Sequence, residues 1–292
     1  MFFSEKDNTL IAKQGNETIT VEAWGKNSLR VRVSQNPCFS GEDHALSRPE
    51  KGGAEVMVSE HYAAIKNGKI SCSVTEWGAI EFFKDGASIL KEYGRDWRVG
   101  NEHSGCMKFF ARTFKAVSGN DYEITARFES DDSEKIFGMG QYQQPQLNLK
   151  GCVLELAQRN SQITIPFYIS NKGYGFFWNN EGIGEVMFGA NYTQWHSKLS
   201  EELDYWITAD DTPKRIVENY TAVTGRAPEF PDNALGLWQC KLRYRTQEEV
   251  LEVAREYKKR GIPLDVIVID FFHWVRQGDG ASTRNTGPTH RL

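Results

Sequence analysis

The sequence predicts a β-sandwich followed by a strand–helix–strand unit with parallel strands. Two observations support this fold class. Between about residues 17 and 210, short segments of alternating, β-branched or aromatic residues follow one another without a helical pattern, which is typical of an antiparallel sandwich. After residue 210 the periodicity becomes helical and ends in a continuous apolar run, as in a βαβ unit.

The clearest strand signals lie in five segments, each rich in residues that favour a pleated, half-buried surface. These segments are TITVEAW (18–24), SLRVRVS (28–34), KISCSVTEW (69–77), AIEFF (79–83) and YEITARF (122–128). The dipeptides Asn67-Gly68 and Asp85-Gly86 fall between such segments. Both are residue pairs that tolerate positive φ, so we expect tight hairpin turns there.

A helix and a linker are predicted after the sandwich. Residues 210–225 carry Pro213 near the expected helix start and Gly225 at its end, with apolar residues at helical spacing between them. The following stretch RAPEFPDN (226–233) contains two prolines. We therefore expect the first domain to end here.

The next segment predicts strand, helix and strand. The apolar run NALGLWQCK (233–241) precedes TQEEVLEVAREYKKRG (246–261), in which Thr246 and Glu249 form a capping-box pattern. Lys258–Arg260 suit the negative end of the helix dipole, and Gly261 ends the helix. LDVIVIDFF (264–272) is a nearly continuous apolar run, as expected for a buried parallel strand. The residues that we expect on the buried stripe of the helix are Val250, Val253, Ala254 and Tyr257.

Composition excludes several classes of protein. Lys and Arg total 35 against 39 Asp and Glu, for a net charge of −4 without long single-sign blocks, so a nucleic-acid partner is not indicated. The five cysteines are widely spaced and odd in number, which predicts neither a zinc site nor a disulfide framework. The N-terminus has no signal-peptide pattern, and no apolar run is long enough to span a membrane. We therefore expect a reduced, cytoplasmic protein without a membrane segment.

Several ordered motifs resemble glycoside hydrolase family 31, the retaining α-glucosidases and α-xylosidases. ALGLWQCKLRYRTQEEVLEVAREYKKRGIPLDVIVIDFFHW (234–274) is similar to the opening of that family's catalytic barrel. Upstream, KIFGMGQY, TIPFYISNKGYGFFWNN and TPKRIVENYTAVTGRAPEFP resemble its N-terminal β-domain and the lead into the barrel. The resemblance covers about residues 130–278, whereas residues 1–129 share only their β-rich character.

The resemblance implies a β-sandwich packed against a (β/α)₈ TIM barrel. We expect an N-terminal sandwich with its linker helix at 1–229 and the first βαβ part of the barrel at 230–278. Asp270 would stand at the C-terminal end of the second barrel strand, the end at which such barrels carry their active sites. The matching acid in the family binds hydroxyls of the non-reducing sugar, and an ionised carboxylate suits that role. The alternative is that Asp270 caps the strand end or pairs with a basic neighbour.

Three aromatic side chains follow Asp270, and they are candidates for contact with the apolar faces of a sugar ring. They are Phe271, Phe272 and Trp274. Because side chains alternate along a strand, only some of them can face a pocket. His273 is not at a catalytic position of the family and has no partner visible in the sequence, so core or rim packing is the alternative for it.

Two further regions supply candidate substrate-binding residues. Trp238 and Tyr244, near the first barrel strand, are candidates to line the site, with structural packing as the alternative for each. Tyr142, beside Gln141, follows FGMG at the position where the β-domain of the family reaches over the active site.

The two catalytic carboxyls of a retaining glycosidase have no match in this sequence. Retention requires a nucleophile and an acid/base about 5 Å apart, and in the family both are Asp residues on later barrel strands. A (β/α)₈ barrel takes about 250 residues, whereas this sequence stops about one and a half units into it. We therefore expect no catalytic residue within residues 1–292.

The tail explains this absence. Family members continue after a segment like RQGD with a tryptophan and then with Pro-Asp-Pro motifs. The sequence DWGFDPEYWPDPPA would be such a continuation. If one nucleotide is deleted from codons that we reconstruct for it, the remaining nucleotides encode DGASTRNTGPTHRL, which is residues 279–292. We therefore expect residues 279–292 to be a frameshifted tail, either real or arising from sequencing.

The resemblance thus implies the N-terminal part of an α-glycosidase that acts on terminal α-linked xylose or glucose of oligosaccharides without a metal or organic cofactor. The stretch DFFHW is closer to the α-xylosidases of the family. Two alternatives stay open, a carbohydrate-binding β-module and a nonfunctional truncated product. A homo-oligomeric full-length form is also left open.

Overall fold

A computed structural model describes residues 1–41, 43, 45–47, 53–94, 98–99, 102–103, 109–244 and 246–270. The chain divides into two compact units, Met1–Arg226, called the β-domain below, and Ala227–Leu292, called the C-terminal unit. The fold class predicted from the sequence is confirmed, because antiparallel strands form the β-domain and a parallel pair of strands with a helix opens the C-terminal unit.

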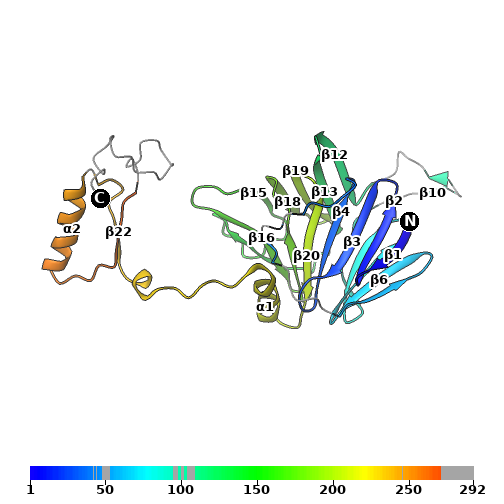
Figure 1. The fold of residues 1–292 in the computed structure, drawn as a ribbon, viewed down its shortest axis with the longest axis horizontal. Coiled ribbons are helices and arrows are strands. Elements are labelled where there is room, and N and C mark those ends of the chain that lie inside the picture. Colours follow the sequence, from blue (N-terminus) through cyan, green and yellow to red (C-terminus); the bar gives the residue numbers. More distant parts are fainter. Residues whose placement is uncertain are drawn as a thin grey trace. The chain divides into compact units, whose positions relative to one another are not determined.

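The first layer of the β-domain is one antiparallel sheet of eight strands (Figure 1). Its middle is formed where β4, near the start of the chain, pairs with β20, the last strand of the domain. In spatial order its strands are β1 (Phe2–Lys6), β2 (Thr9–Gln14), β3 (Glu17–Ala23), β4 (Ser28–Ser34), β20 (Leu203–Ala209), β17 (Tyr174–Trp178), β16 (Ile163–Ser170) and β14 (Ile136–Gln141).

The second layer consists of two five-stranded antiparallel sheets. One contains β5 (Glu55–Val58), β6 (Tyr62–Asn67), β7 (Ile70–Thr75), β8 (Ile80–Lys84) and β9 (Ala87–Lys91). The other contains, in spatial order, β12 (Arg112–Ser118), β13 (Asp121–Glu129), β19 (Tyr192–Ser200), β18 (Gly184–Phe188) and β15 (Val153–Leu156). A bridge between Glu92 and Phe128 joins the two sheets. The short strands β10 (Arg98–Val99) and β11 (Glu102–His103) pair with each other.

The core lies between the layers and is dominated by aromatic rings. Phe176 is fully buried, and its ring centroid lies 5.0 Å from that of Tyr205 and 5.3 Å from that of Trp195. Trp178 and Trp195 stack at 5.3 Å. The expected hairpin turn at Asp85-Gly86 joins β8 to β9, and both residues have positive φ, 48° and 87°. That backbone conformation is why a turn dipeptide is needed there.

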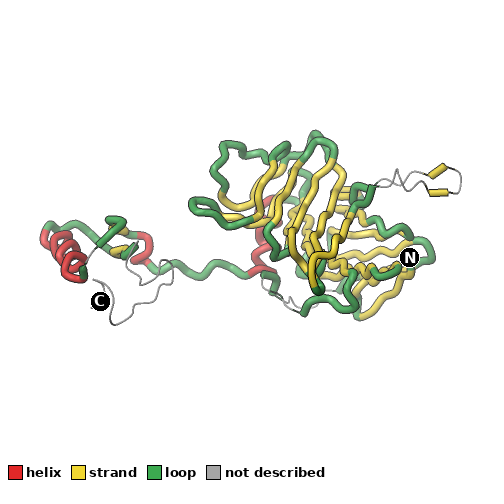
Figure 2. Tube along the Cα trace, turned by 90° about the horizontal axis from the view of Figure 1, so that it is seen from above, coloured by secondary structure: helices red, strands yellow, loops and turns green. Residues whose placement is uncertain are grey.

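Helix α1 (Pro213–Thr224) covers the outer face of the first layer (Figure 2). It begins where the sequence predicts, because Thr212 caps it by accepting a hydrogen bond from the Arg215 N–H, 3.3 Å away. Ile216 and Val223 are buried in a second apolar cluster, which includes Trp206 of β20. The helix therefore packs as part of the β-domain.

The C-terminal unit contains the predicted strand, helix and strand. A 3₁₀ helix (Asp232–Leu235) precedes β21 (Trp238–Cys240), α2 (Gln247–Lys259) and β22 (Val266–Val268). The two strands are parallel, with Trp238 opposite Val266. Strand β22 is shorter than the apolar run predicts and is half-buried rather than buried, because a two-stranded sheet covers it incompletely. Helix α2 begins after Thr246, whose hydroxyl accepts from the Glu249 N–H at 3.1 Å.

Candidate functional site

Asp270 lies two residues beyond the C-terminal end of β22, beside the C-terminal end of β21. Cys240 is the last residue of β21 and is opposite Val268 in the parallel register. The Cys240 Sγ lies 3.6 Å from the Asp270 Oδ2 and accepts a hydrogen bond from the Leu242 N–H at 3.4 Å. Parallel strands bring their carboxyl ends to one edge, which is the edge that carries function in α/β barrels. Asp270 is therefore placed where a ligand-binding carboxylate is expected, although its role stays a prediction.

The other predicted site residues of the C-terminal unit have different environments. Trp238 is 52% exposed, and its indole N–H donates to the Ala234 carbonyl oxygen at 3.0 Å. Tyr244 is buried and accepts a hydrogen bond from Gln239, which favours a packing role for it. The remaining candidates lie outside the described residues. They are Phe271, Phe272, His273 and Trp274.

Tyr142 follows β14 in the β-domain, and its hydroxyl already has partners there. It donates to the Glu155 carbonyl oxygen at 2.7 Å and shares a hydrogen bond with the Thr164 hydroxyl at 3.0 Å. Burial raises the pKa of this hydroxyl. The phenol thus ties the end of β14 to β15 and to β16, and a further contact with substrate remains a prediction.

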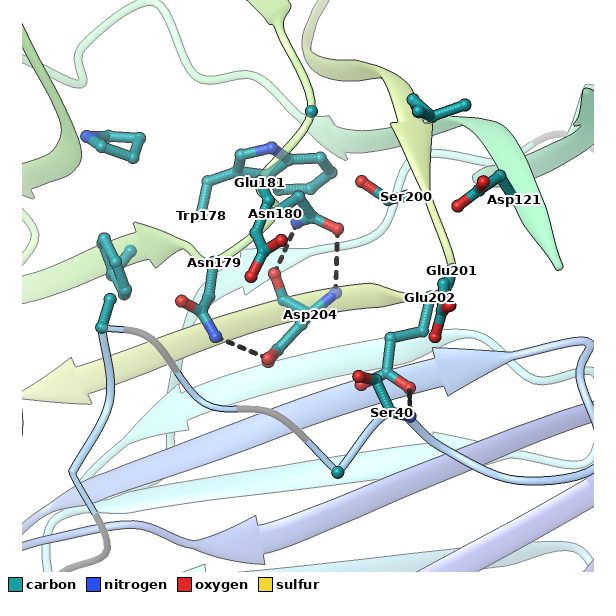
Figure 3. Close-up of a pocket in the computed structure, with 16 residues that line it drawn as sticks. Ser40, Asp121, Trp178, Asn179, Asn180, Glu181, Ser200, Glu201, Glu202 and Asp204 are labelled. Carbon is teal, nitrogen blue, oxygen red and sulfur yellow. Dashed lines mark hydrogen bonds between the residues drawn. The ribbon is translucent and has the colours of Figure 1, made fainter.

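A pocket of about 870 Å³ lies in the β-domain, and no feature of the sequence predicts it (Figure 3). The turn after β17 forms one wall, the β19–β20 hairpin forms another, and Ser40, Gly41 and Ala45 line the side toward the segment after β4. The turn and the hairpin approach each other closely. A Cβ atom at Gly182 would lie 2.1 Å from the Leu199 carbonyl oxygen, so a glycine is required there.

Asp204 is the most tightly bound carboxylate of the pocket. The Arg30 guanidinium donates to it through Nε at 3.1 Å and Nη2 at 2.6 Å, and the Asn179 side chain donates at 2.6 Å. The Asn180 side chain bonds the backbone of Asp204 twice. It donates to the Asp204 carbonyl oxygen at 2.7 Å and accepts from the Asp204 N–H at 3.2 Å. Burial raises the pKa of Asp204, and Arg30 opposes that shift. Figure 3 shows the two amides gathered around Asp204.

Glu202 lines the pocket beside Ser40. Its Oε2 accepts a hydrogen bond from the Ser40 N–H at 2.9 Å, whereas its Oε1 lies 3.9 Å from the Arg32 Nη1, beyond hydrogen-bond distance. Burial raises the pKa of Glu202 to about 7. This carboxyl therefore exchanges its proton near neutral pH and keeps one oxygen available as an acceptor.

The strand-end site at Asp270 and the pocket of the β-domain offer a ligand different functional groups. The strand-end site offers one half-buried carboxylate, Asp270, with a thiol beside it. The pocket offers several carboxyl and amide groups around apolar walls. Within the described part of the chain, no group of three or more His, Cys, Asp or Glu side chains is arranged to hold a metal ion.

The sequence does not predict the pocket, because the residues that line it are scattered along the chain. Asn179 and Asp204 come together through the pairing of β17 with β20, in which Trp178 is opposite Tyr205. The asparagine pair 179–180 and the acidic run 201–204 were the available signals. Neither signal indicates its partner without the strand pairing.

These features define a β-sandwich domain followed by the start of a parallel strand–helix–strand unit. Residues 18–185 match the model of the glycosyl hydrolase 31 N-terminal galactose mutarotase-like domain, and residues 227–287 match that of the glycosyl hydrolases family 31 TIM-barrel domain. The chain belongs to glycosyl hydrolase family 31.

Individual relatives agree with this assignment. The crystal structure of a family 31 α-xylosidase from a soil metagenome, complexed with xylose, is 47% identical, with a TM-score of 0.88 over 96% of this chain and 43% of that chain. An uncharacterized family 31 glucosidase, ORF2, of Pseudescherichia vulneris is 45% identical over 94% of this chain and 54% of its own length. α-Xylosidase A of Aspergillus niger is 30% identical over 96% of this chain and 40% of its own length.

The chain spans about half or less of the length of these relatives.

The helices of the described residues, α1 and α2, are both too short to cross a membrane.

Proposed function

We propose that this chain is the N-terminal part of a retaining α-glycosidase that removes terminal α-linked xylose, in preference to glucose, from oligosaccharides. The observation that carries the proposal is the position of Asp270 just beyond β22, at the edge where the parallel strands end. Membership of family 31 supports the reaction class. The preference for xylose is supported by the DFFHW stretch and by relatives that are named α-xylosidases.

In this proposal Asp270 accepts hydrogen bonds from hydroxyls of the terminal sugar. An ionised carboxylate can accept two strong hydrogen bonds, and such charge-assisted bonds are stronger than neutral ones. The nearby Cys240 thiol would donate to the carboxylate and hold its orientation. The aromatic residues at 271, 272 and 274 would contact the apolar faces of the ring. A cytoplasmic location is proposed from the four cysteines that are free thiols among the described residues, Cys38, Cys72, Cys152 and Cys240.

The proposal also states that residues 1–292 alone do not cleave a glycosidic bond. Cleavage with retention requires a nucleophile and an acid/base on opposite sides of the bond, and the resemblance assigns both to later barrel strands. The purified 292-residue chain should therefore release no aryl alcohol from an aryl α-xyloside or α-glucoside. Turnover by a sample shown by mass spectrometry to contain no longer enzyme would contradict the proposal.

The role of Asp270 is tested in an enzyme whose reading frame is restored by one nucleotide near codon 280. That frame should continue for several hundred residues and supply two Asp-bearing strand ends. Asp270→Ala removes a charged acceptor worth about 1.5 to 3 kcal/mol. We expect kcat/KM on an aryl α-xyloside to fall roughly 10- to 150-fold.

Asp132→Ala is the matched control, because Asp132 is an exposed aspartate in a turn of the β-domain. It should leave kcat/KM unchanged. Equal kinetics for Asp270→Ala and the parent enzyme would show that Asp270 is structural. A higher kcat/KM for the α-glucoside than for the α-xyloside would reverse the proposed specificity without affecting the role of Asp270.

A further inference from the structure

The described residues that line the pocket all belong to the β-domain, and the pocket has the size of a small-molecule site. Its volume of about 870 Å³ falls within the range of about 300 to 1,000 Å³ that is usual for ligand pockets. We propose that this pocket binds a neutral saccharide, as a second carbohydrate site that does not depend on Asp270.

The charges of the described lining disfavour an anionic ligand. Among the described residues that line the pocket, every titratable side chain is acidic, and none is Lys, Arg or His. The acidic residues are Asp121, Glu181, Glu201, Glu202 and Asp204. A phosphorylated sugar or a nucleotide would therefore meet repulsion throughout the pocket.

A metal ion or another compact cation is also disfavoured. Asp204 already has its charge balanced by Arg30, which is buried behind it. Glu202 exchanges its proton near neutral pH because burial raises its pKa to about 7. No metal-holding group of side chains occurs among the described residues. A ligand that offers hydroxyls rather than charge matches this environment.

The lining has hydrogen-bonding capacity left at Glu202. Its Oε1 has no donor within hydrogen-bond distance among the described residues. Buried polar groups are nearly always satisfied, so this oxygen calls for a further donor. A sugar hydroxyl can donate to it and at the same time accept a hydrogen bond from another group.

Apolar side chains complete the pocket. Pro166 and Leu199 lie on its wall, and Leu199 is exposed. The apolar C–H face of a sugar ring can contact them while its hydroxyls reach the polar groups around Glu202. The described lining is richer in polar residues than most small-molecule sites, but it keeps the combination of apolar walls and convergent polar groups that such sites use.

The test uses the whole 292-residue chain, with D-xylose and isomaltotriose as probes. Binding is measured by saturation-transfer difference NMR and by titration calorimetry. We expect dissociation constants of about 1 to 10 mM, which correspond to weak but specific binding. Since the ligand is neutral, raising the salt concentration should not weaken binding, because only interactions between charges are screened.

Ala45→Trp blocks the entrance with a large ring, because Ala45 is exposed and lines the pocket. Affinity should fall at least about tenfold, a change of 1.4 kcal/mol. Ala87→Trp is the matched control, since Ala87 is exposed in β9 and does not line the pocket. Glu202→Ala removes an acceptor without adding bulk and should also weaken binding. Circular dichroism checks that each variant is folded.

Asp270→Ala separates this site from the proposed function. Saccharide binding that persists in Asp270→Ala and is weakened in both Ala45→Trp and Glu202→Ala supports the pocket. Binding that Asp270→Ala abolishes and the pocket variants leave intact overturns the pocket and leaves the proposed function standing. No binding at about 50 mM sugar, a concentration well above the expected dissociation constants, also overturns the proposal. A cationic probe such as spermidine binding in place of sugar, with affinity lost at high salt, would do the same.

Discussion

The two units of the chain both contain elements that the sequence predicts, yet among the described residues only the β-domain has an extensive core of its own. In the β-domain, Phe176 and Trp195 are fully buried among other aromatic rings between the two layers. Among the described residues of the C-terminal unit, Tyr244 and Val250 are the buried side chains. The difference shows that local signals place helices and strands, whereas independent stability requires enough apolar surface removed from water.

The largest expected effect compares core truncation in the two units. Phe176→Ala removes a ring that contacts Phe128, Tyr168, Trp195 and Tyr205. Deletions of this kind lower the free energy of unfolding by about 3 to 5 kcal/mol. Urea unfolding of the whole chain, followed by tryptophan fluorescence and far-UV circular dichroism, should show that loss in the transition of the β-domain.

Val250→Ala is the counterpart in the C-terminal unit, on the half-buried stripe of α2. It should leave the main unfolding transition at the same urea concentration, because the β-domain is a separate compact unit. If Val250→Ala lowered that transition as much as Phe176→Ala, the two units would form one cooperative core, and the comparison would fail.

The same contrast explains how much could be predicted from the sequence. Strand β4, the turn at Asp85-Gly86 and both helices have signals within a few residues of themselves, such as alternation, a turn dipeptide or a capping threonine. These signals depend on the backbone conformation of one segment. They are therefore readable without knowledge of the rest of the chain.

Contacts between distant segments could not be predicted in this way. The pairing of β4 with β20 and the ion pair of Arg30 with Asp204 join residues at least 170 positions apart. The pocket depends on two such pairings, because β17 with β20 brings Asn179 to Asp204, and β4 with β20 brings Ser40 to Glu202. For the strand-end site the position of Asp270 could be predicted, because a parallel βαβ unit fixes which end of a strand is shared.

An effect of intermediate size is expected in the pH dependence of the free energy of unfolding of the β-domain. Burial raises the pKa of Glu202 from 4.5 to about 7. The folded state therefore binds more protons than the unfolded state between these values, and the free energy of unfolding falls as pH rises through that window. A shift of this size corresponds to about 2 to 3 kcal/mol, with allowance for partial solvent screening.

Glu202→Gln should remove this part of the pH dependence. The variant should be more stable than the parent at pH 8, and the difference should shrink toward zero at pH 4.5. Thermal unfolding at several pH values measures it. Glu201→Gln is the matched control, because Glu201 is the adjacent and exposed glutamate, and it should reproduce the pH profile of the parent. A Glu202→Gln profile parallel to that of the parent would show that Glu202 titrates as an ordinary surface carboxyl.

The smallest expected effect compares two helix caps of the same type. Thr212 caps α1 and Thr246 caps α2, each through its hydroxyl oxygen and the backbone N–H three residues later. Replacing a capping threonine with alanine removes about 1 kcal/mol. Since α1 buries Ile216 and Val223 against the β-domain, Thr212→Ala should lower the free energy of unfolding of that domain by this amount.

Thr246→Ala should instead act within the C-terminal unit. Helix α2 is not part of the β-domain, so the main unfolding transition should stay unchanged while amide hydrogen exchange in the first turn of α2 becomes faster. Thr→Ser at each position is the control, because serine also caps helices. A loss of β-domain stability in Thr246→Ala, or none in Thr212→Ala, would mean that a cap's contribution is not confined to the unit in which its helix packs. That result would remove the basis for treating the two units as energetically separate.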